Sequence, residues 1–143
     1  MKNNWGIVGC AYMAQEYCKV LVAKGIMPQV FSRDLVSANV KKFQEIFPQL
    51  TVKAFSAFST EVDQWIVCTN IESHEMICEQ LQGRIYCEKP FAHDTQYDAS
   101  KAISILLNRR YYYWVNYIKD IIEGYAELFE LHPETIVLQE GDM

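Results

Sequence analysis

The sequence lacks a long hydrophobic run, an excess of basic residues and any cysteine pair of the CxxC type. A membrane-spanning helix needs about 20 consecutive apolar residues, and no run reaches that length, so we expect no membrane partner. The formal net charge is −5, whereas a general nucleic-acid-binding protein needs a basic face that neutralises phosphates. We therefore expect no nucleic-acid partner. The first residues, MKNNWGIVG, do not resemble a signal peptide.

The cysteines are odd in number and scattered, which is typical of buried free thiols in the reducing cytoplasm. They are Cys10, Cys18, Cys68, Cys78 and Cys87. The order Cys68, His74, Cys78 provides no second pair of ligands for a closed zinc shell. The sequence therefore predicts no metal site and a cytoplasmic protein.

Short apolar runs alternate with longer amphipathic ones, without repeats, linkers or low-complexity segments. The expected strands are 5–9, 27–32, 50–55, 63–69, 84–88 and 102–107, and the expected helices are 11–24, 36–47, 72–81, a short one capped by Asp94, and 114–129. The helix over 36–47 places Val36, Val40, Phe43 and Phe47 on one face. Strands that alternate with helices indicate an α/β fold, a parallel sheet covered on both faces.

The first strand leads into GIVGCAYMA, which matches G-x-G-x-x-G/A through Gly9, Ala11 and Ala14. In that pattern the first position permits a tight turn, the second lets backbone N–H groups approach a pyrophosphate, and the third allows close packing of helix on strand. The methyl group of Ala11 weakens the match. The alternative is an ordinary strand-to-helix turn without a nucleotide.

The second strand ends in VFSRD, where a site selective for NAD usually carries an acidic residue. Ser32 and Arg33 suit the 2′-phosphate of NADP instead, because arginine offers it a planar set of donors. Asp34 is expected to cap the next helix. We therefore predict NADP rather than NAD, unless Arg33 is only a solvated loop charge.

The fourth strand is followed by Thr69, Asn70 and His74 in CTNIESHE. Such a loop can offer polar groups to a nucleotide at the carboxyl ends of the strands. Thr69 or Asn70 can equally cap the helix that begins near Glu72.

Five segments in this order, GIVGCAYMA, VFSRD, CTNIESHE, CEKPFA and LLNRRYY, resemble the glucose–fructose oxidoreductase / inositol dehydrogenase (Gfo/Idh/MocA) family. The resemblance runs from Trp5 to about Gly124, and the E-K-P tripeptide followed by N-R-R-aromatic is its specific part. It implies a Rossmann-type doubly wound domain over residues 1–124 that binds NADP (or NAD), followed by a helix end and tail over 125–143. The cofactor-binding residues that it implies include Tyr12, Met13, Glu88, Pro90 and Arg109 besides those named above.

The E-K-P lysine of that family points into the active site beside the nicotinamide. Carried over, Lys89 contacts substrate and cofactor and assists proton transfer, while Glu88 and Pro90 shape its loop. The bond before this proline is often cis in such relatives. The alternative is an exposed lysine of no consequence. Asn108, Arg109 and Arg110 are expected near the same site, although Arg109 or Arg110 can instead pair with acidic helix residues.

Family members normally continue into a larger second domain that supplies the substrate pocket and further acid–base groups, commonly an aspartate and a histidine. This sequence ends at Met143 without one. We therefore expect either an oxidoreductase component acting on a sugar or polyol, or a shortened, non-catalytic nucleotide-binding or regulatory module; a fragment of a longer protein is a third possibility. The aromatic helix over 114–129 is a candidate surface for self-association, or simply packs its apolar face in the core.

Overall fold

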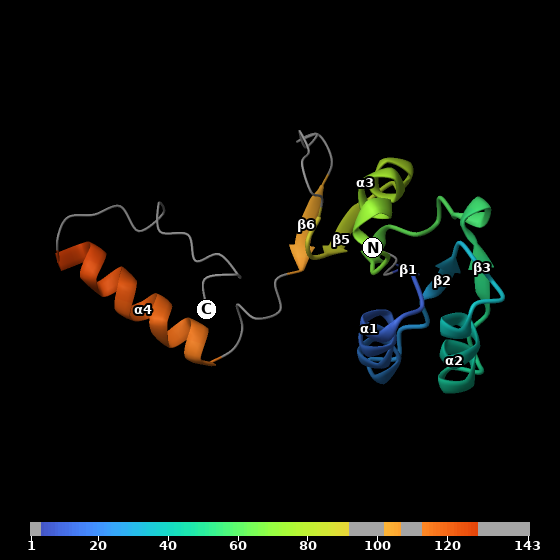
Figure 1. Cartoon of the computed structure of the whole chain (residues 1–143), viewed down its shortest axis with the longest axis horizontal. Helices are drawn as coiled ribbons and strands as arrows, with labels where there is room; N and C mark the ends of the chain where they lie inside the picture. Colours follow the sequence, from blue (N-terminus) through green and yellow to red (C-terminus); the bar gives the residue numbers. More distant parts are fainter. Residues whose placement is uncertain (1–3, 92–101, 107–112, 129–143) are drawn as a thin grey trace. The chain divides into compact units, whose positions relative to one another are not determined.

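The computed structural model describes residues 4–91, 102–106 and 113–128 (Figure 1). The strands are β1 (Trp5–Val8), β2 (Gln29–Ser32), β3 (Val52–Ala54), β4 (Gln64–Val67), β5 (Arg84–Glu88) and β6 (Ile103–Leu106). The helices are α1 (Tyr12–Ala23), α2 (Ala38–Ile46), α3 (Ile71–Gln80) and α4 (Tyr113–Leu128), with a short 3₁₀ helix, η1 (Phe55–Ala57). Every strand lies within a range predicted from the sequence. The predicted short helix at Asp94 lies outside the described residues.

The six strands form one parallel sheet in the order β3-β2-β1-β4-β5-β6. The chain winds outward from β1 to β3, returns to the centre, and winds outward again from β4 to β6. The winding direction therefore reverses between β1 and β4, which is the position where doubly wound sheets bind ligands. This order confirms the predicted α/β, Rossmann-type fold.

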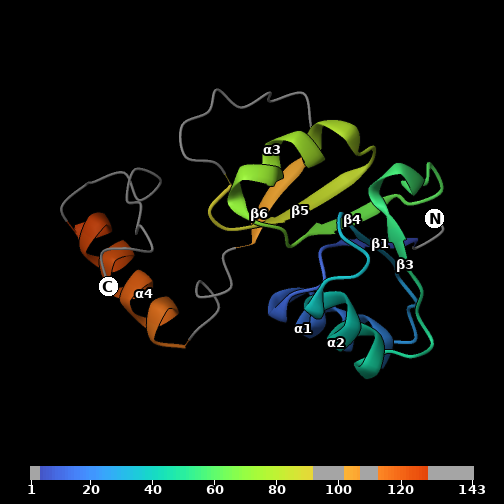
Figure 2. The ribbon, with the colours of Figure 1, turned by 45° about the vertical axis from the view of Figure 1, so that its right-hand side comes forward.

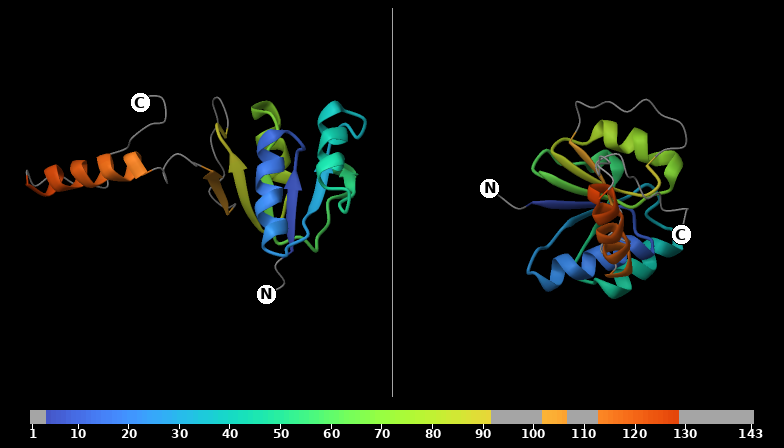
Figure 3. Two further views of the ribbon diagram at one scale, coloured as in Figure 1. Left: turned by 90° about the horizontal axis from the view of Figure 1, so that it is seen from below. Right: turned by 90° about the vertical axis from the view of Figure 1, so that its left-hand side faces the viewer.

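The two faces of the sheet carry different helices, with α1 and α2 on one face and α3 on the other (Figures 2 and 3). Successive strand residues point to opposite faces, so Ile7 packs in the core beneath α1 and α2, and Val8 packs in the core beneath α3. Ala14 of α1 and Ile77 of α3 are fully buried in these two cores. Burial on both faces explains why the strands read as nearly continuous apolar runs.

The connection from β3 to β4 contains η1 instead of an α-helix. Aromatic side chains fill the space there: the ring of Phe58 lies 5.1 Å from that of Phe31 and 5.5 Å from that of Trp65, both edge-on. Edge-to-face aromatic contacts at such distances stabilise a core beyond their buried area. This cluster therefore covers the sheet where no long helix does.

The beginning of α2 differs from the sequence prediction. Helix α2 starts at Ala38, and Ser37 is its N-cap residue, with its hydroxyl accepting a hydrogen bond from the N–H of Val40 at 3.3 Å. Asp34 does not cap the helix, because its Oδ1 instead accepts from the N–H of Val36 at 3.0 Å. Val36 therefore lies in a turn, 76% exposed, and not on the buried helix face.

The chain divides into two compact units, one ending at Leu106 and the other beginning at Leu107. Helix α4 belongs to the second unit. The predicted limit of the dinucleotide-binding domain at residue 124 stays a prediction. None of the helices in the described ranges has both the length and the apolar content that crossing a bilayer requires.

Candidate functional site

The carboxyl ends of four strands lie side by side at one end of the sheet. Val8 of β1 is in register with Phe31 of β2 and with Val67 of β4, which is in register with Cys87 of β5. The residues that follow these positions therefore emerge next to one another. The structure thus brings together four of the predicted segments, beginning at Gly9, Ser32, Thr69 and Glu88. Arg109, with Asn108 and Arg110, lies outside the described residues.

Gly9 makes the turn between β1 and α1. Its φ is +109°, in the region that favours glycine. A Cβ at this position would lie 2.5 Å from the carbonyl oxygen of Cys68, so the turn passes directly against the end of β4. The N–H of Gly9 donates to the carbonyl oxygen of Phe31 at 2.8 Å, which continues the sheet beyond β1. Only glycine fits here, as the phosphate-turn interpretation requires.

The backbone N–H groups of the first turn of α1 lie at the carboxyl end of the sheet, and no side chain caps them. Ala11 is the N-cap residue, has an extended conformation, and makes no side-chain cap; no acidic residue lies in the first turn. The side chain of Tyr12 is 67% exposed, whereas that of Met13 packs against the core. A helix start with open N–H donors and a positive dipole end is a favourable place for a phosphate.

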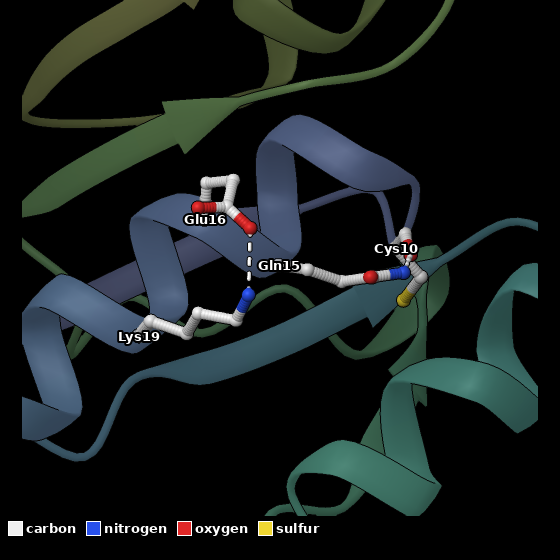
Figure 4. A network of polar contacts seen from close by, with 4 residues as sticks. All are labelled: Cys10, Gln15, Glu16 and Lys19. Carbon is white, nitrogen blue, oxygen red and sulfur yellow. Dashed lines mark hydrogen bonds and ion pairs between the residues drawn. The ribbon is translucent and has the colours of Figure 1, made fainter.

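Gln15 supports the turn from inside and was missed by the sequence analysis. It is 4% exposed, and its Nε2 donates to the carbonyl oxygen of Cys10 at 3.1 Å (Figure 4). The sequence feature that could have identified it is its position: Gln15 follows Ala14, on the face of α1 that the helical period places against the sheet. On the outer side of the same helix, Glu16 and Lys19 form an exposed ion pair of 2.7 Å.

Ser32 is the last residue of β2, and Arg33 follows it at the same end of the sheet. The hydroxyl of Ser32 donates to the carbonyl oxygen of Asp34 at 3.3 Å, and the side chain of Arg33 is exposed. An exposed guanidinium one residue beyond the strand can reach a phosphate without first losing a buried partner. The position thus suits the predicted role.

Asn70 is the N-cap residue of α3, as the capping alternative predicted. Its Oδ1 accepts from the hydroxyl of Ser73, however, and makes no bond to the first helical N–H groups. Thr69 is half-buried, and its hydroxyl lies 3.5 Å from the carbonyl oxygen of Asn70. Both residues therefore lie at the sheet end, where a nucleotide can approach their polar groups.

His74 is placed differently from the prediction, which put it among the nucleotide contacts. It is 1% exposed and lies within α3, below the loops. Its Nε2 lies 2.8 Å from the carbonyl oxygen of Thr69, and its Nδ1 lies 3.0 Å from that of Pro90. Because both ring nitrogens already face protein atoms and the ring is buried, His74 supports the site from behind and does not offer a polar group to a ligand.

Residues 88–90, the lysine loop, comprise the last residue of β5 and the two residues that follow it. Lys89 is half-buried, and the bond between Lys89 and Pro90 is cis, as the resemblance implied. Glu88 accepts a hydrogen bond of 2.6 Å at Oε1 from the hydroxyl of Tyr17 on α1. Burial, together with this bond to Glu88, raises the pKa of Tyr17, so the phenol remains a donor at neutral pH. Tyr17 was not predicted, because its partner lies 71 residues away.

The five cysteines are all free and buried, as predicted. Burial, with a smaller contribution from Cys18, raises the pKa of the Cys10 thiol to about 12, and burial raises that of Cys18 to about 11. Such thiols are inert at neutral pH. The described residues contain no group of three or more histidine, cysteine or acidic side chains placed to hold a metal ion.

Comparison with protein-family models and with curated proteins finds no match. Solved structures do match. An NAD-binding protein from Listeria innocua matches 87% of this chain with a TM-score of 0.68 and 18% sequence identity. A myo-inositol dehydrogenase from Lactobacillus casei, in complex with NAD(H) and myo-inositol, matches 87% of this chain with a TM-score of 0.63 and 18% sequence identity. A Rex-family repressor matches 87% of this chain with a TM-score of 0.59 and 13% sequence identity. The chain covers 41%, 42% and 62% of these three proteins. At these identities the similarity shows a shared fold, the Rossmann-type α/β sheet described above.

Proposed function

We propose that this chain binds a nicotinamide dinucleotide, NADPH in preference to NADH, and is the cofactor-binding part of an oxidoreductase that acts on a sugar or polyol. One observation carries the proposal: the Gly9 turn, the Ser32–Arg33 pair, Thr69 and Lys89 follow strands that end side by side where the winding reverses. The similarity to an NAD-binding protein and to an inositol dehydrogenase supports it.

The described residues fit such a cofactor in two respects. Gly9 keeps the turn free of a side chain, and the start of α1 presents N–H donors without an internal acceptor, which suits the pyrophosphate. Ser32 and Arg33 would receive the 2′-phosphate, with Thr69 and Asn70 beside the remainder of the dinucleotide. The bound dinucleotide would supply or accept the hydride.

Lys89 would act on the oxygen of the reacting carbinol or carbonyl. Its ammonium group can polarise a carbonyl and neutralise the charge that develops on the oxygen. It can also move a proton between Nζ and that oxygen. Tyr12, Met13, Glu88 and Pro90 would line or shape the site around it.

Cofactor choice is tested by titration with NADPH and NADH, followed by energy transfer from tryptophan to the nicotinamide. We expect micromolar NADPH binding, about 8 kcal/mol. Arg33→Ala should weaken NADPH binding about tenfold and leave NADH binding unchanged, because only NADPH carries the phosphate that Arg33 would contact. Lys24→Ala is the matched control, since Lys24 is an exposed cation at the opposite end of α1. Absence of any dinucleotide binding would refute the proposal.

Catalysis is tested on a panel of keto sugars and polyols with NADPH or NADP. Lys89→Ala should abolish turnover while NADPH affinity changes little, because the lysine would act on the reacting oxygen and not on the phosphates. Turnover that persists unchanged in Lys89→Ala would remove this role.

A second function, a non-catalytic regulatory module, is favoured by the similarity to a Rex-family repressor, of which the chain covers 62%. Firm dinucleotide binding without turnover on any substrate of the panel would support that function over the first.

Self-association through α4 is the third part of the proposal. The sequence of this helix places apolar residues at alternating spacings of four and three, as in the contact seam of a coiled coil: Trp114, Ile118, Ile121, Tyr125 and Leu128. A second copy of the same helix would complete such a seam. Analytical ultracentrifugation should show a dimer that Ile121→Asp dissociates; a monomer at all concentrations would refute it.

A further inference from the structure

We propose that Tyr17 and His74 are positioning residues that hold the lysine loop from the two faces of the sheet and thereby fix the place of Lys89. Tyr17 belongs to α1 and holds the residue before the lysine; His74 belongs to α3 and holds the residue after it. Helices α1 and α3 lie on opposite faces of the sheet (Figure 2). The inference rests on the proposed function only for its effect on dinucleotide binding.

The attachment through Tyr17 is short and directional. The hydroxyl of Tyr17 donates to Oε1 of Glu88 at 2.6 Å, within the range of strong bonds to a carboxylate. Both side chains are half-buried, so water competes less for the carboxylate than it does at the surface. The raised pKa of Tyr17 keeps its proton on the phenol oxygen, and the bond persists over the whole neutral range. Glu88 is therefore held toward α1.

The attachment through His74 joins two loops at once. The ring lies between the carbonyl oxygens of Thr69, after β4, and Pro90, after β5. The ring contacts both carbonyl oxygens, at 2.8 Å and 3.0 Å, and so connects the two loops. With only 1% of the residue exposed, water does not replace either contact. His74 thus sets the separation between Thr69 and the lysine loop, the two elements that flank the proposed nicotinamide position.

Lys89 lies between these two attachments, and the position of its side chain depends on both of them. A lysine side chain is long and flexible, so the position of its ammonium group depends on how firmly the adjacent backbone is held. A displacement of about 1 Å at a reacting group is enough to lower catalysis strongly. Glu88 and Pro90 are the residues immediately before and after it, and each is bonded to a different helix. The geometry therefore assigns a role to two side chains that need not touch a ligand.

The first experiment needs no nucleotide. In protein whose lysines are ¹³C-methylated, the Lys89 signal, identified by its loss in Lys89→Arg, should shift in Tyr17→Phe and in His74→Phe. It should stay in place in the controls Glu16→Gln and Glu75→Gln, which change exposed residues of the same two helices.

The second experiment measures NADPH affinity in the same variants. Because Lys89 is expected to contribute little to affinity, Tyr17→Phe should leave binding nearly unchanged. His74→Phe also frees Thr69, which is proposed to lie beside the dinucleotide, and should weaken binding about threefold. His74→Gln, which keeps an N–H donor, should restore part of the loss. If His74→Phe does not fold, the affinity of His74→Gln and the Lys89 signal in Tyr17→Phe still test the positioning role.

The outcomes separate the two proposals. A Lys89 signal that stays in place in both Tyr17→Phe and His74→Phe overturns the positioning role even if the wild type binds NADPH normally. A wild type that binds no dinucleotide, but whose Lys89 signal shifts as described, refutes the proposed function and leaves the positioning role standing.

Discussion

Helices α1 and α2 lie on the same face of the sheet and begin at the same end of it, yet their first turns differ (Figure 2). In α2, the hydroxyl of Ser37 accepts a hydrogen bond from the N–H of Val40. In α1, Ala11 has the same extended conformation but no side-chain oxygen. The first N–H groups of a helix need acceptors. Helix α2 thus provides part of its own cap, whereas α1 leaves its donors open to an outside anion.

Among the variants that test this difference between α1 and α2, Gly9→Ala is expected to have the largest effect on stability and NADPH affinity, because it disrupts the turn that leads into α1. The new Cβ would meet the carbonyl oxygen of Cys68 at 2.5 Å, and φ of +109° is strained for alanine. The free energy of unfolding, measured by urea denaturation, should fall by about 3 kcal/mol. NADPH affinity should fall at least tenfold.

Gly25→Ala is the matched control for that prediction. Gly25 also has a positive φ, +76°, but a Cβ there meets nothing within 4 Å. It should lower the free energy of unfolding by only about 1 kcal/mol, the conformational cost alone. Equal losses in the two variants would contradict the close approach of the Gly9 turn to β4.

An intermediate effect is expected from Ala11→Asp, which gives α1 the kind of cap that α2 has. The carboxylate would accept from the first-turn N–H groups and raise the free energy of unfolding by about 1 kcal/mol. It would also occupy the donors proposed for the pyrophosphate and repel its charge, so NADPH binding should weaken about fivefold in the fluorescence titration. Ala11→Asn separates the two causes, because it caps without a charge. Unchanged affinity in Ala11→Asp would exclude the start of α1 as the phosphate site.

The smallest effect is expected from Ser37→Ala, which makes α2 resemble α1. The free energy of unfolding should fall by about 1 kcal/mol through loss of the cap. NADPH affinity should not change, since α2 has no part in the proposed site. A clear change in affinity would show that the two helices are not independent.

The sequence predicted the fold well because apolar runs and their spacing are local signals. Strands such as Trp5–Val8 and Gln64–Val67 are short, apolar and separated by helical stretches, and their parallel order follows from that alternation. The start of α2 was predicted two residues early, with Asp34 as its cap. Asp34 and Ser37 are both good capping residues, and only the observed turn at Asp34 decides between them.

The sequence predicted the loops of the candidate site, but not the side chains that hold those loops in place. Gly9 was found because glycine before a helix has a specific meaning, and the resemblance implied the cis bond after Lys89. Tyr17 and the burial of His74 were not found, since their partners lie 71 and 16 residues away and no local pattern reports such contacts. A histidine between two backbone carbonyls leaves no trace in sequence spacing.

The central position of β1 has a consequence for how the protein folds during synthesis. This strand leaves the ribosome before the other five, yet one of its two neighbours is β4, in which Gln64, nearly sixty residues later, pairs with Trp5. At a synthesis rate of roughly 5–20 residues per second, an apolar strand therefore waits about 3–12 s for that partner. During this interval its unpaired edge is open to incorrect pairing, so nascent chains of this protein should depend on holding chaperones more than chains whose first strand pairs with the next.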